Sequence, residues 1–364
     1  MSYDPSTRGS APVGVRTIVL CDNKRGGRTL EVELWYPAAE LHRGQDLVLL
    51  TQDRFEPAPG LEPLAQRAVR DAEPVASSYP LILFFHGAVA HRRYSSGLCT
   101  HLASHGYVVA SPDFPGNTLA DQVHDMRLEP GATPRLVGSV RSAADRPLDA
   151  SLVINALLSG AAPGLSELID RDRIGTAGQS FGGWTVLALN SKDDRPKASF
   201  PIVPPWGRGP ARTETLSDLL CLDDWGRDVP TFVLAAERDS VVILDGVRDL
   251  YRKLNGSKRL AILKGAGHMH FGDNAEVEHE GFRAACGSNN YPVGGEHSID
   301  FPAIAAATPP FSELCPADHG KVVVRGLCLA HMDAHLRQLP EARDYLNGDL
   351  PALFAMRGID LEVQ

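Results

Sequence analysis

Short, continuous apolar runs recur along the chain, and stretches with apolar residues at helical spacing separate them. Runs of this length are typical of parallel strands that are covered on both faces of a sheet. The runs lie at Leu81–Phe85, Gly106–Ala110, Arg173–Ala177, Ala198–Val203, Thr231–Ala236 and Leu260–Lys264. The helical patterns lie at Tyr94–His105, Pro147–Ser159, Trp184–Leu189 and Val242–Leu254. This alternation predicts an α/β fold with a mostly parallel central sheet and helices on both of its faces.

The N-terminal part of the chain departs from this alternation. Val15–Leu20 and Leu30–Tyr36 flank the turn-forming stretch Asp22–Gly27, so they predict an antiparallel hairpin. Residues 37–79 are rich in Pro, Ala, Arg and Glu. We expect an irregular surface passage there, with a helix near Leu61–Arg70.

Two long segments predict insertions in one α/β domain that spans residues 1–364. Residues 112–147 are rich in Pro, Gly, Asp and Arg and follow the carboxyl end of a predicted strand. Residues 271–318 are unusually long for a structureless connection. We expect loops or lids in both places, where they would shape the choice of substrate.

Composition and charge exclude several classes of partner. The chain has 364 residues, a net charge of −9 and a pI of about 5.8. Its basic residues are scattered, which argues against nucleic acid or an anionic membrane as the main partner. The longest apolar runs are too short to span a bilayer. Met1–Ser10 lacks the apolar core of a signal peptide, so we expect a cytoplasmic protein, or a secreted one if a leader has been removed.

The six cysteines show no C-x-x-C spacing, so we expect neither a zinc nor a redox site. Their low number suggests buried thiols in a reducing compartment. Cys286 and Cys315 bracket an irregular segment, and they are the candidates for a disulfide if the protein were exported.

The stretch with the most specific chemistry is Gly178–Gly182, which reads G-x-S-x-G. This pattern is typical of a nucleophile elbow, a sharp turn from a strand into a helix that exposes a strained serine. Glycines are needed there because side chains would collide with the neighbouring strand and helix. Ser180 is therefore the candidate nucleophile.

Two further candidates follow predicted strands in the same way. Asp239 comes three residues after Thr231–Ala236, and His268 follows Leu260–Lys264. Because catalytic groups in open α/β sheets collect at the carboxyl ends of the strands, we expect Ser180, Asp239 and His268 to project from one edge.

These residue types suit acyl transfer. A serine hydroxyl needs a base within hydrogen-bond reach, and His268 can take its proton and later deliver it to the leaving group. Asp239 would hold the imidazole in the required tautomer. The developing oxyanion needs backbone N–H donors, which we expect from Phe181 and Ala88. This chemistry requires neither a metal nor another cofactor.

The ordered set of motifs resembles the α/β-hydrolase superfamily, in its branch of dienelactone hydrolase-like and platelet-activating-factor acetylhydrolase-like esterases. The resemblance implies an α/β-hydrolase fold and serine esterase activity with a triad in the order Ser, Asp, His. It covers nearly the whole chain except roughly residues 38–78, 112–140 and 274–318. The matching stretches are Gly14–Thr17, Val32–Pro37, Leu83–Gly87, Gly106–Val109, Arg146–Asp149, the elbow, Gly265–Asp273 and Arg325–Leu336.

The position of the acid departs from one part of this branch. In platelet-activating-factor acetylhydrolases the triad acid follows the strand after the nucleophile helix, whereas this chain has Val203–Trp206 there, without a carboxylate. The later position of Asp239 resembles dienelactone hydrolases and cutinase-like polyesterases, and this weakens the specific case for phospholipid acetylhydrolase activity. Glu237 is the alternative acid.

Other residues near the predicted site have competing interpretations. His270 is the alternative base to His268. Asp113 is interpreted as a loop-ordering residue, and His331 and His335 as packing or surface residues. A metal site could be drawn from His268, His270, Asp273, Glu276, Glu278 and His279, but we expect none, because a hydrolase of this kind needs no metal.

The candidates for a substrate pocket are His86, Trp184, Trp206 and His270, with Phe181 as a further aromatic one. The same aromatic residues would serve equally well in the core. His86 precedes a glycine, and we interpret it chiefly as ordering the oxyanion loop.

The sequence therefore predicts a serine hydrolase that cleaves a small-molecule carboxylic ester through an acyl-enzyme. Lactone or amide hydrolysis and acyl transfer would use the same groups and stay open as alternatives. A non-catalytic hydrolase-like binding protein would have a broken triad, and here the triad is complete. The identity of the substrate and the oligomeric state are not predicted.

Overall fold

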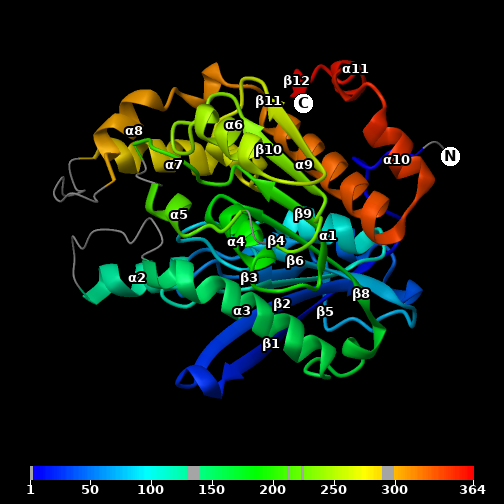
Figure 1. Cartoon of the computed structure of the whole chain (residues 1–364). Coiled ribbons are helices and arrows are strands. Elements are labelled where there is room, and N and C mark those ends of the chain that lie inside the picture. Colours follow the sequence, from blue (N-terminus) through cyan, green and yellow to red (C-terminus); the bar gives the residue numbers. More distant parts are fainter. Residues whose placement is uncertain (1–2, 129–139, 211–213, 223–224, 289–298) are drawn as a thin grey trace.

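A mixed 10-stranded sheet forms the centre of the computed structural model, which describes residues 3–128, 140–210, 214–222, 225–288 and 299–364 (Figure 1). The strand order is β12-β11-β10-β9-β8-β6-β7-β2-β1-β5. These strands are β1 (Val13–Asp22), β2 (Arg28–Pro37), β5 (Val69–Arg70), β6 (Tyr79–Phe85), β7 (Val108–Pro112), β8 (Ile169–Gln179), β9 (Pro196–Ile202), β10 (Thr231–Ala236), β11 (Lys258–Leu263) and β12 (Leu361–Val363). A second, two-stranded sheet pairs β3 (Asp53–Phe55) with β4 (Leu64–Gln66).

Helices follow most strands of the large sheet. The α-helices are α1 (Ser96–Ser104), α2 (Leu119–Leu128), α3 (Val140–Leu158), α4 (Phe181–Asn190), α5 (Glu214–Asp218), α6 (Leu244–Lys253), α7 (Ala275–Gly287), α8 (Phe301–Ala307), α9 (Ala317–Met332), α10 (Pro340–Asn347) and α11 (Leu350–Ala355). The short 3₁₀ turns are η1 (Asn23–Arg25), η2 (Glu40–His42), η3 (Gln45–Leu47), η4 (Ser166–Leu168), η5 (His268–Phe271) and η6 (Phe311–Glu313). A π-helical turn, η7 (Asp333–Arg337), continues α9.

The middle of the sheet is parallel, as the apolar runs predict. β7, β6, β8, β9, β10 and β11 run in one direction, each pairing in parallel with the next. β1 and β2 form an antiparallel hairpin, and β2 joins it to β7. At the opposite edge β12 pairs antiparallel with β11. The α/β fold and the N-terminal hairpin are both confirmed.

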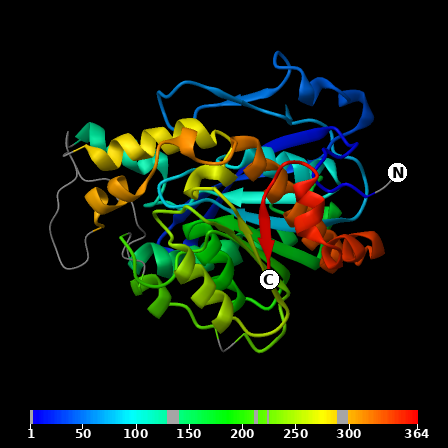
Figure 2. The ribbon, with the colours of Figure 1, turned by 90° about the horizontal axis from the view of Figure 1, so that it is seen from above.

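Alternate residues of each central strand face opposite layers of helices, because side chains of a strand alternate between the two faces. In β6, Ile82 and Phe84 pack with residues of α1 and α9, whereas Leu83 and Phe85 pack with residues of α3 and α4. Next to them, α6 covers β10 and β11 on the side of α3 and α4. Figures 1 and 2 show the sheet enclosed between these layers.

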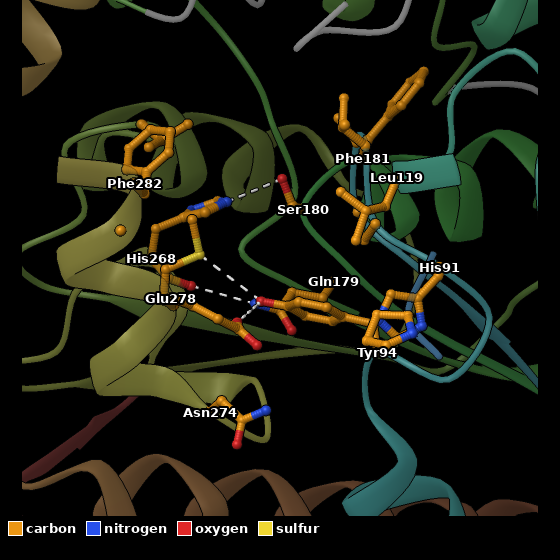
Figure 3. Close-up of a pocket in the computed structure, with 18 of the residues that line it drawn as sticks. His91, Tyr94, Leu119, Gln179, Ser180, Phe181, His268, Asn274, Glu278 and Phe282 are labelled. Carbon is orange, nitrogen blue, oxygen red and sulfur yellow. Dashed lines mark hydrogen bonds between the residues drawn. The ribbon is translucent and has the colours of Figure 1, made fainter. Parts of the chain in front are cut away.

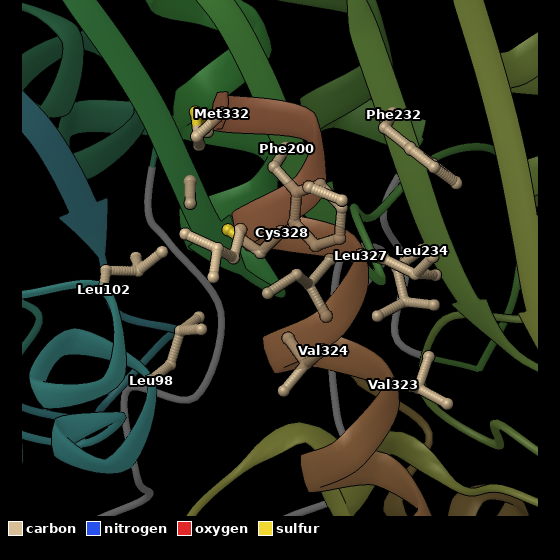
Figure 4. Packing of buried hydrophobic residues seen from close by; sticks show 14 of the residues in the cluster. Leu98, Leu102, Phe200, Phe232, Leu234, Val323, Val324, Leu327, Cys328 and Met332 are labelled. Carbon is tan, nitrogen blue, oxygen red and sulfur yellow. The ribbon is translucent and has the colours of Figure 1, made fainter. Parts of the chain in front are cut away.

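Among the described residues, the largest cluster of buried apolar side chains lies on the face of the sheet that α1 and α9 cover. Leu327 and Cys328 of α9 lie against Phe200 of β9, and Leu234 of β10 lies beside them (Figure 4). Each buried leucine or phenylalanine contributes about 1.5–3 kcal/mol through the hydrophobic effect. This layer holds the carboxyl ends of β8, β10 and β11 in a fixed relation.

The helix expected near Leu61–Arg70 is wrong. That segment contains β4 and β5: β4 pairs antiparallel with β3, and Arg70 reaches from β5 to the buried carboxylate of Glu33 at 2.9 Å. Leu61 and Leu64 of this segment line the cavity described below.

The segments expected as loops are partly helical. Residues 112–147 include α2 and the start of α3, and residues 271–318 include α7 and α8. The remaining parts, 129–139 and 289–298, lie outside the described residues. Among the residues that the structure describes, no helix is long and apolar enough to cross a membrane.

Candidate active site

The turn at Ser180 joins β8 directly to α4. Ser180 has φ 57° and ψ −122°, a conformation that L-residues rarely adopt. A β-carbon on Gly178 would lie 2.5 Å from the carbonyl oxygen of Gly182, and one on Gly182 would lie 1.9 Å from the carbonyl oxygen of Phe85. Both positions therefore require glycine, which is the physical reason for the G-x-S-x-G pattern.

Ser180, His268 and Asp239 form one chain of hydrogen bonds. His268 Nε2 lies 3.0 Å from Ser180 Oγ (Figure 3), and His268 Nδ1 lies 2.6 Å from Asp239 Oδ2. The second carboxylate oxygen of Asp239 accepts the backbone N–H groups of Val241 and Val242, each at 2.8 Å. These two bonds fix the carboxylate of Asp239, which accepts the hydrogen on His268 Nδ1. His268 Nε2 then carries no hydrogen and can accept the proton of Ser180.

The alternative residues for the acid and the base bind elsewhere. Glu237 accepts the backbone N–H of Gly265 at 2.9 Å and pairs with Lys264 at 3.1 Å. His270 accepts the N–H of Gly267 at 3.0 Å and its Nε2 lies 2.9 Å from the carbonyl oxygen of Cys315. Asp113 binds the backbone N–H and the guanidinium of Arg92.

The two expected oxyanion donors lie beside the serine. Phe181 is the first residue of α4, where a helix leaves its backbone N–H groups without intrahelical acceptors. Ala88 follows Gly87, and a β-carbon on Gly87 would lie only 3.4 Å from Ser180 Cβ. Both Phe181 and Ala88 line the same cavity as Ser180.

This cavity has a volume of about 870 Å³ and is mostly apolar. It takes residues from the segment before β5, from the loop after β6, from α2 and from α7, so it is built from parts far apart in the sequence. No lysine or arginine is among the described residues that line it. The apolar lining includes Pro57, Leu61, Leu64, Val89, Leu119, Leu216, Val242, Met269, Val277 and Phe282.

Comparisons with known proteins agree with this fold. The family described as platelet-activating factor acetylhydrolase, isoform II, matches residues 4–120, and the chlorophyllase family matches residues 63–200. Over 38 residues the chain is 45% identical to chlorophyllase-1 of Arabidopsis thaliana, a stretch that covers 10% of this chain and 12% of that protein. The ferulic acid esterase from Streptomyces cinnamoneus has the same fold, with a TM-score of 0.57 and 23% identity over 93% of this chain and 95% of that chain.

The chain has the α/β fold of this esterase structure and is similar, over less than half of its length in each case, to the two matched families. Both matched families are families of carboxylic ester hydrolases. The match to the curated chlorophyllase spans about an eighth of that protein's length.

Four residues predicted to line the pocket of this hydrolase lie outside the lining of the cavity. Trp184 is buried below Phe181 and donates to the carbonyl oxygen of Leu216 at 2.8 Å. Trp206 donates to Asp249 at 2.9 Å and packs beside α6. His86 is fully buried behind the oxyanion loop, and His270 stacks on a phenylalanine ring 4.9 Å away. Of the aromatic candidates, Phe181 lines the cavity.

The free cysteines and the acidic cluster have ordinary structural places. All six cysteines, Cys286 and Cys315 included, are free thiols. Asp273 accepts from the Ser96 hydroxyl at 2.8 Å and from the backbone N–H of Gly97 at 2.9 Å. His279 Nε2 lies 2.8 Å from the carbonyl oxygen of Pro309. Within the described parts of the chain, no group of three or more His, Cys, Asp or Glu side chains is arranged to hold a metal ion.

Sequence reasoning missed the polar wall of the cavity. Glu278 of α7 accepts the phenolic hydrogen of Tyr94, and Gln179 lies next to them and donates to the carbonyl oxygen of His268 at 3.3 Å (Figure 3). Burial raises the pKa of Glu278 to about 7, with a further increase from the charge of Asp273. In the sequence, Glu278 stands out only because it lies close to His268, and this closeness indicated a possible metal site and not a wall of the cavity.

The stability of this hydrolase should therefore depend on Glu278 between pH 4.5 and 7. The folded state raises the carboxyl pKa from 4.5 to about 7 and so favours the protonated form. Its contribution is fully present below pH 4.5 and is lost as the pH rises through 7. Urea unfolding should show that Glu278→Gln, which is neutral throughout, gains stability relative to the wild type as the pH rises from 5 to 8.

Glu276→Gln is the matched control, because Glu276 is exposed on the same helix. A Glu278→Gln difference that stays constant over this pH range, or that matches the control, would contradict the assignment.

Proposed function

We propose that this chain is a serine hydrolase that cleaves a carboxylic ester through an acyl-enzyme on Ser180. The observation that carries the proposal is the continuous hydrogen-bond chain from Ser180 Oγ through His268 to Asp239, with distances of 3.0 and 2.6 Å. It opens onto an apolar cavity large enough for a drug-sized ligand. The similarity of parts of the chain to two families of ester hydrolases supports the same conclusion.

The reaction has two matched halves. Ser180 Oγ bonds to the carbonyl carbon while its proton passes to His268, which then protonates the leaving alcohol as the ester C–O bond breaks. Water attacks the acyl-enzyme in the second half, again losing its proton to His268, and the acid product and free Ser180 result. Asp239 stabilises the imidazolium that exists in each tetrahedral intermediate. The N–H groups of Phe181 and Ala88 bind the oxyanion.

The lining of the cavity favours neutral substrates. An anionic group bound there would lose its hydration and meet no cationic side chain among the described lining residues, and it would face Glu278. We therefore propose that the substrate is a largely apolar, uncharged ester.

Ser180→Ala should remove both activity and labelling. Hydrolysis of p-nitrophenyl esters should fall by a factor on the order of 10⁶ or to background, because the nucleophile is lost. A fluorophosphonate should label the wild type at one site and leave the variant unlabelled. Labelling of another residue in the wild type, or persistent turnover in the variant, would show that the mechanism is wrong.

Asp239→Asn should lower kcat by about 10⁴-fold while the protein stays folded, because the amide holds His268 in the wrong tautomer. The matched control is Glu237→Gln, which changes the other carboxylate of the same loop and should retain nearly full activity. The kcat of both variants can be measured by stopped-flow or steady-state assays on one ester. The reverse ranking of the two variants would move the acid to Glu237.

The charge preference can be measured with two p-nitrophenyl esters whose acyl chains end in a methyl ester or in a free carboxylate. At pH 8 the neutral member should have about tenfold or greater kcat/KM, because its competitor buries an unpaired charge. Glu278→Gln should reduce that ratio, and Glu276→Gln should leave it unchanged. Equal rates on both esters would refute the proposed preference.

A further inference from the structure

The guanidinium of Arg146 lies behind the loop that supplies one of the proposed oxyanion donors. Arg146 belongs to α3 and is fully buried. Its Nη1 donates to the carbonyl oxygen of His86 at 2.8 Å, and its Nη2 donates to the carbonyl oxygen of Gly87 at 3.2 Å. Nη2 also donates to Asn117 Oδ1 at 2.7 Å. One side chain thus binds two successive carbonyl groups of the loop.

The carbonyl oxygen of Gly87 receives a second hydrogen bond from His86. The backbone N–H of Phe114 donates to His86 Nε2 at 3.3 Å, so this nitrogen is an acceptor and the ring hydrogen is on Nδ1. His86 Nδ1 lies 2.7 Å from the Gly87 oxygen and donates to it. Burial, together with the charge of Arg146, holds the pKa of His86 well below its usual range, which keeps the ring neutral in this tautomer.

These bonds orient the proposed donor because the peptide unit is rigid. The carbonyl of Gly87 and the N–H of Ala88 belong to one planar unit, and in a trans peptide they point in opposite directions. A carbonyl held toward Arg146 and His86 therefore directs the Ala88 N–H away from them. The next residue, Val89, has φ 55°, which is strained for a β-branched residue, so the loop depends on such contacts to keep its shape.

The same guanidinium contacts the residue of the second donor. Its central carbon lies 4.2 Å from the centroid of the Phe181 ring and 4.2 Å from that of Phe114. Cation–π contacts of this kind are stronger when the cation is desolvated. Arg146 therefore contacts the side chain of Phe181, whose N–H is one proposed oxyanion donor. It also binds the carbonyl of the peptide unit whose N–H, on Ala88, is the other.

The charge of Arg146 has no direct counter-ion in the part of the chain that the structure describes. The nearby carboxylate of Asp149 binds Arg25 at 2.6 Å and Arg28 at 2.8 Å instead. Burial lowers the pKa of Arg146 below its usual range, which reflects the cost of keeping this cation away from water. A negative charge that develops nearby during the reaction would offset part of that cost.

We propose that Arg146 is the positioning residue of the oxyanion hole, aligning the Ala88 and Phe181 N–H groups on one point and polarising the Ala88 peptide through its carbonyl. The proposal rests on the proposed acyl transfer at Ser180. Arg146 does not line the cavity and does not bind Ser180. We therefore expect it to stabilise the transition state and to leave the binding of the substrate in the ground state unchanged.

The test is Arg146→Lys, which keeps the charge but replaces the planar, forked guanidinium by a compact ammonium group that cannot stack between two rings. We expect kcat per labelled serine to fall about 100-fold on a p-nitrophenyl ester, with KM within about threefold of the wild type. The affinity of a trifluoromethyl ketone, whose adduct with Ser180 carries an oxyanion, should fall in parallel. The affinity of the corresponding methylene compound, which has no carbonyl, should stay unchanged.

Arg195→Lys is the control, because Arg195 also makes several bonds, to Asp193 and to Asn155 at 2.7 Å, away from the cavity lining. It should lower the melting temperature without changing kcat or the affinity of the ketone. Asn117→Ala, which removes one of the bonds to Arg146, is the second variant in case Arg146→Lys does not fold. It should lower kcat about tenfold at constant KM.

Wild-type kcat and ketone affinity in a folded Arg146→Lys or Asn117→Ala protein would overturn the proposal, as would equal losses for the ketone and the methylene compound. These outcomes would leave the proposed function intact. Failure of the proposed function would instead appear as an unlabelled Ser180 in the wild type.

Discussion

No side chain fits between Gly182 and the carbonyl oxygen of Phe85, where a β-carbon would approach to 1.9 Å, and the whole site depends on this contact. It brings the first turn of α4 against the end of β6. Ser180 is thereby forced into its left-handed conformation, and the loop after β6 passes beside it. Ser180, the proposed nucleophile, and both proposed oxyanion donors are thus placed by a single close approach of two backbones.

His268 and Asp239, the proposed base and acid, are placed by a different constraint, the parallel pairing of β10 with β11 and with β9. Six pairs of residues join β10 and β11, from Thr231 with Lys258 to Ala236 with Leu263. The loops after the two strands therefore begin at the same level. Asp239 is fixed further by two backbone N–H groups, and His268 by the bond from Gln179. The rigid core between α9 and the sheet keeps the two halves of the site in register.

The fold and the three central residues could be predicted from the sequence because each depends on a local pattern. Apolar runs mark the parallel strands, and Ser180, Asp239 and His268 each stand at a fixed place after such a run. The cavity could not be predicted in this way, because its walls come from segments such as Leu61, Leu119 and Val277, which meet only through tertiary packing.

Residue type alone also misled where burial decides the role. Trp184 and Trp206 suggest an aromatic pocket, but their indole N–H groups bind Leu216 and Asp249, and neither tryptophan lines the cavity. The sequence indicated only a possible metal ligand at Glu278, whereas in the structure its carboxylate accepts a hydrogen bond from the hydroxyl of Tyr94. Arg146 lies in Arg146–Asp149, one of the stretches that carry the family resemblance, but nothing in the sequence indicates that its charge is buried.

A covalent acyl-enzyme on Ser180 can be detected by mass spectrometry of the protein quenched during turnover of a slowly deacylating ester. We expect a mass increase of one acyl group, located on the peptide that contains Ser180 and formed before steady state. An unmodified protein under conditions of full turnover, or an acyl group on another residue, would contradict it.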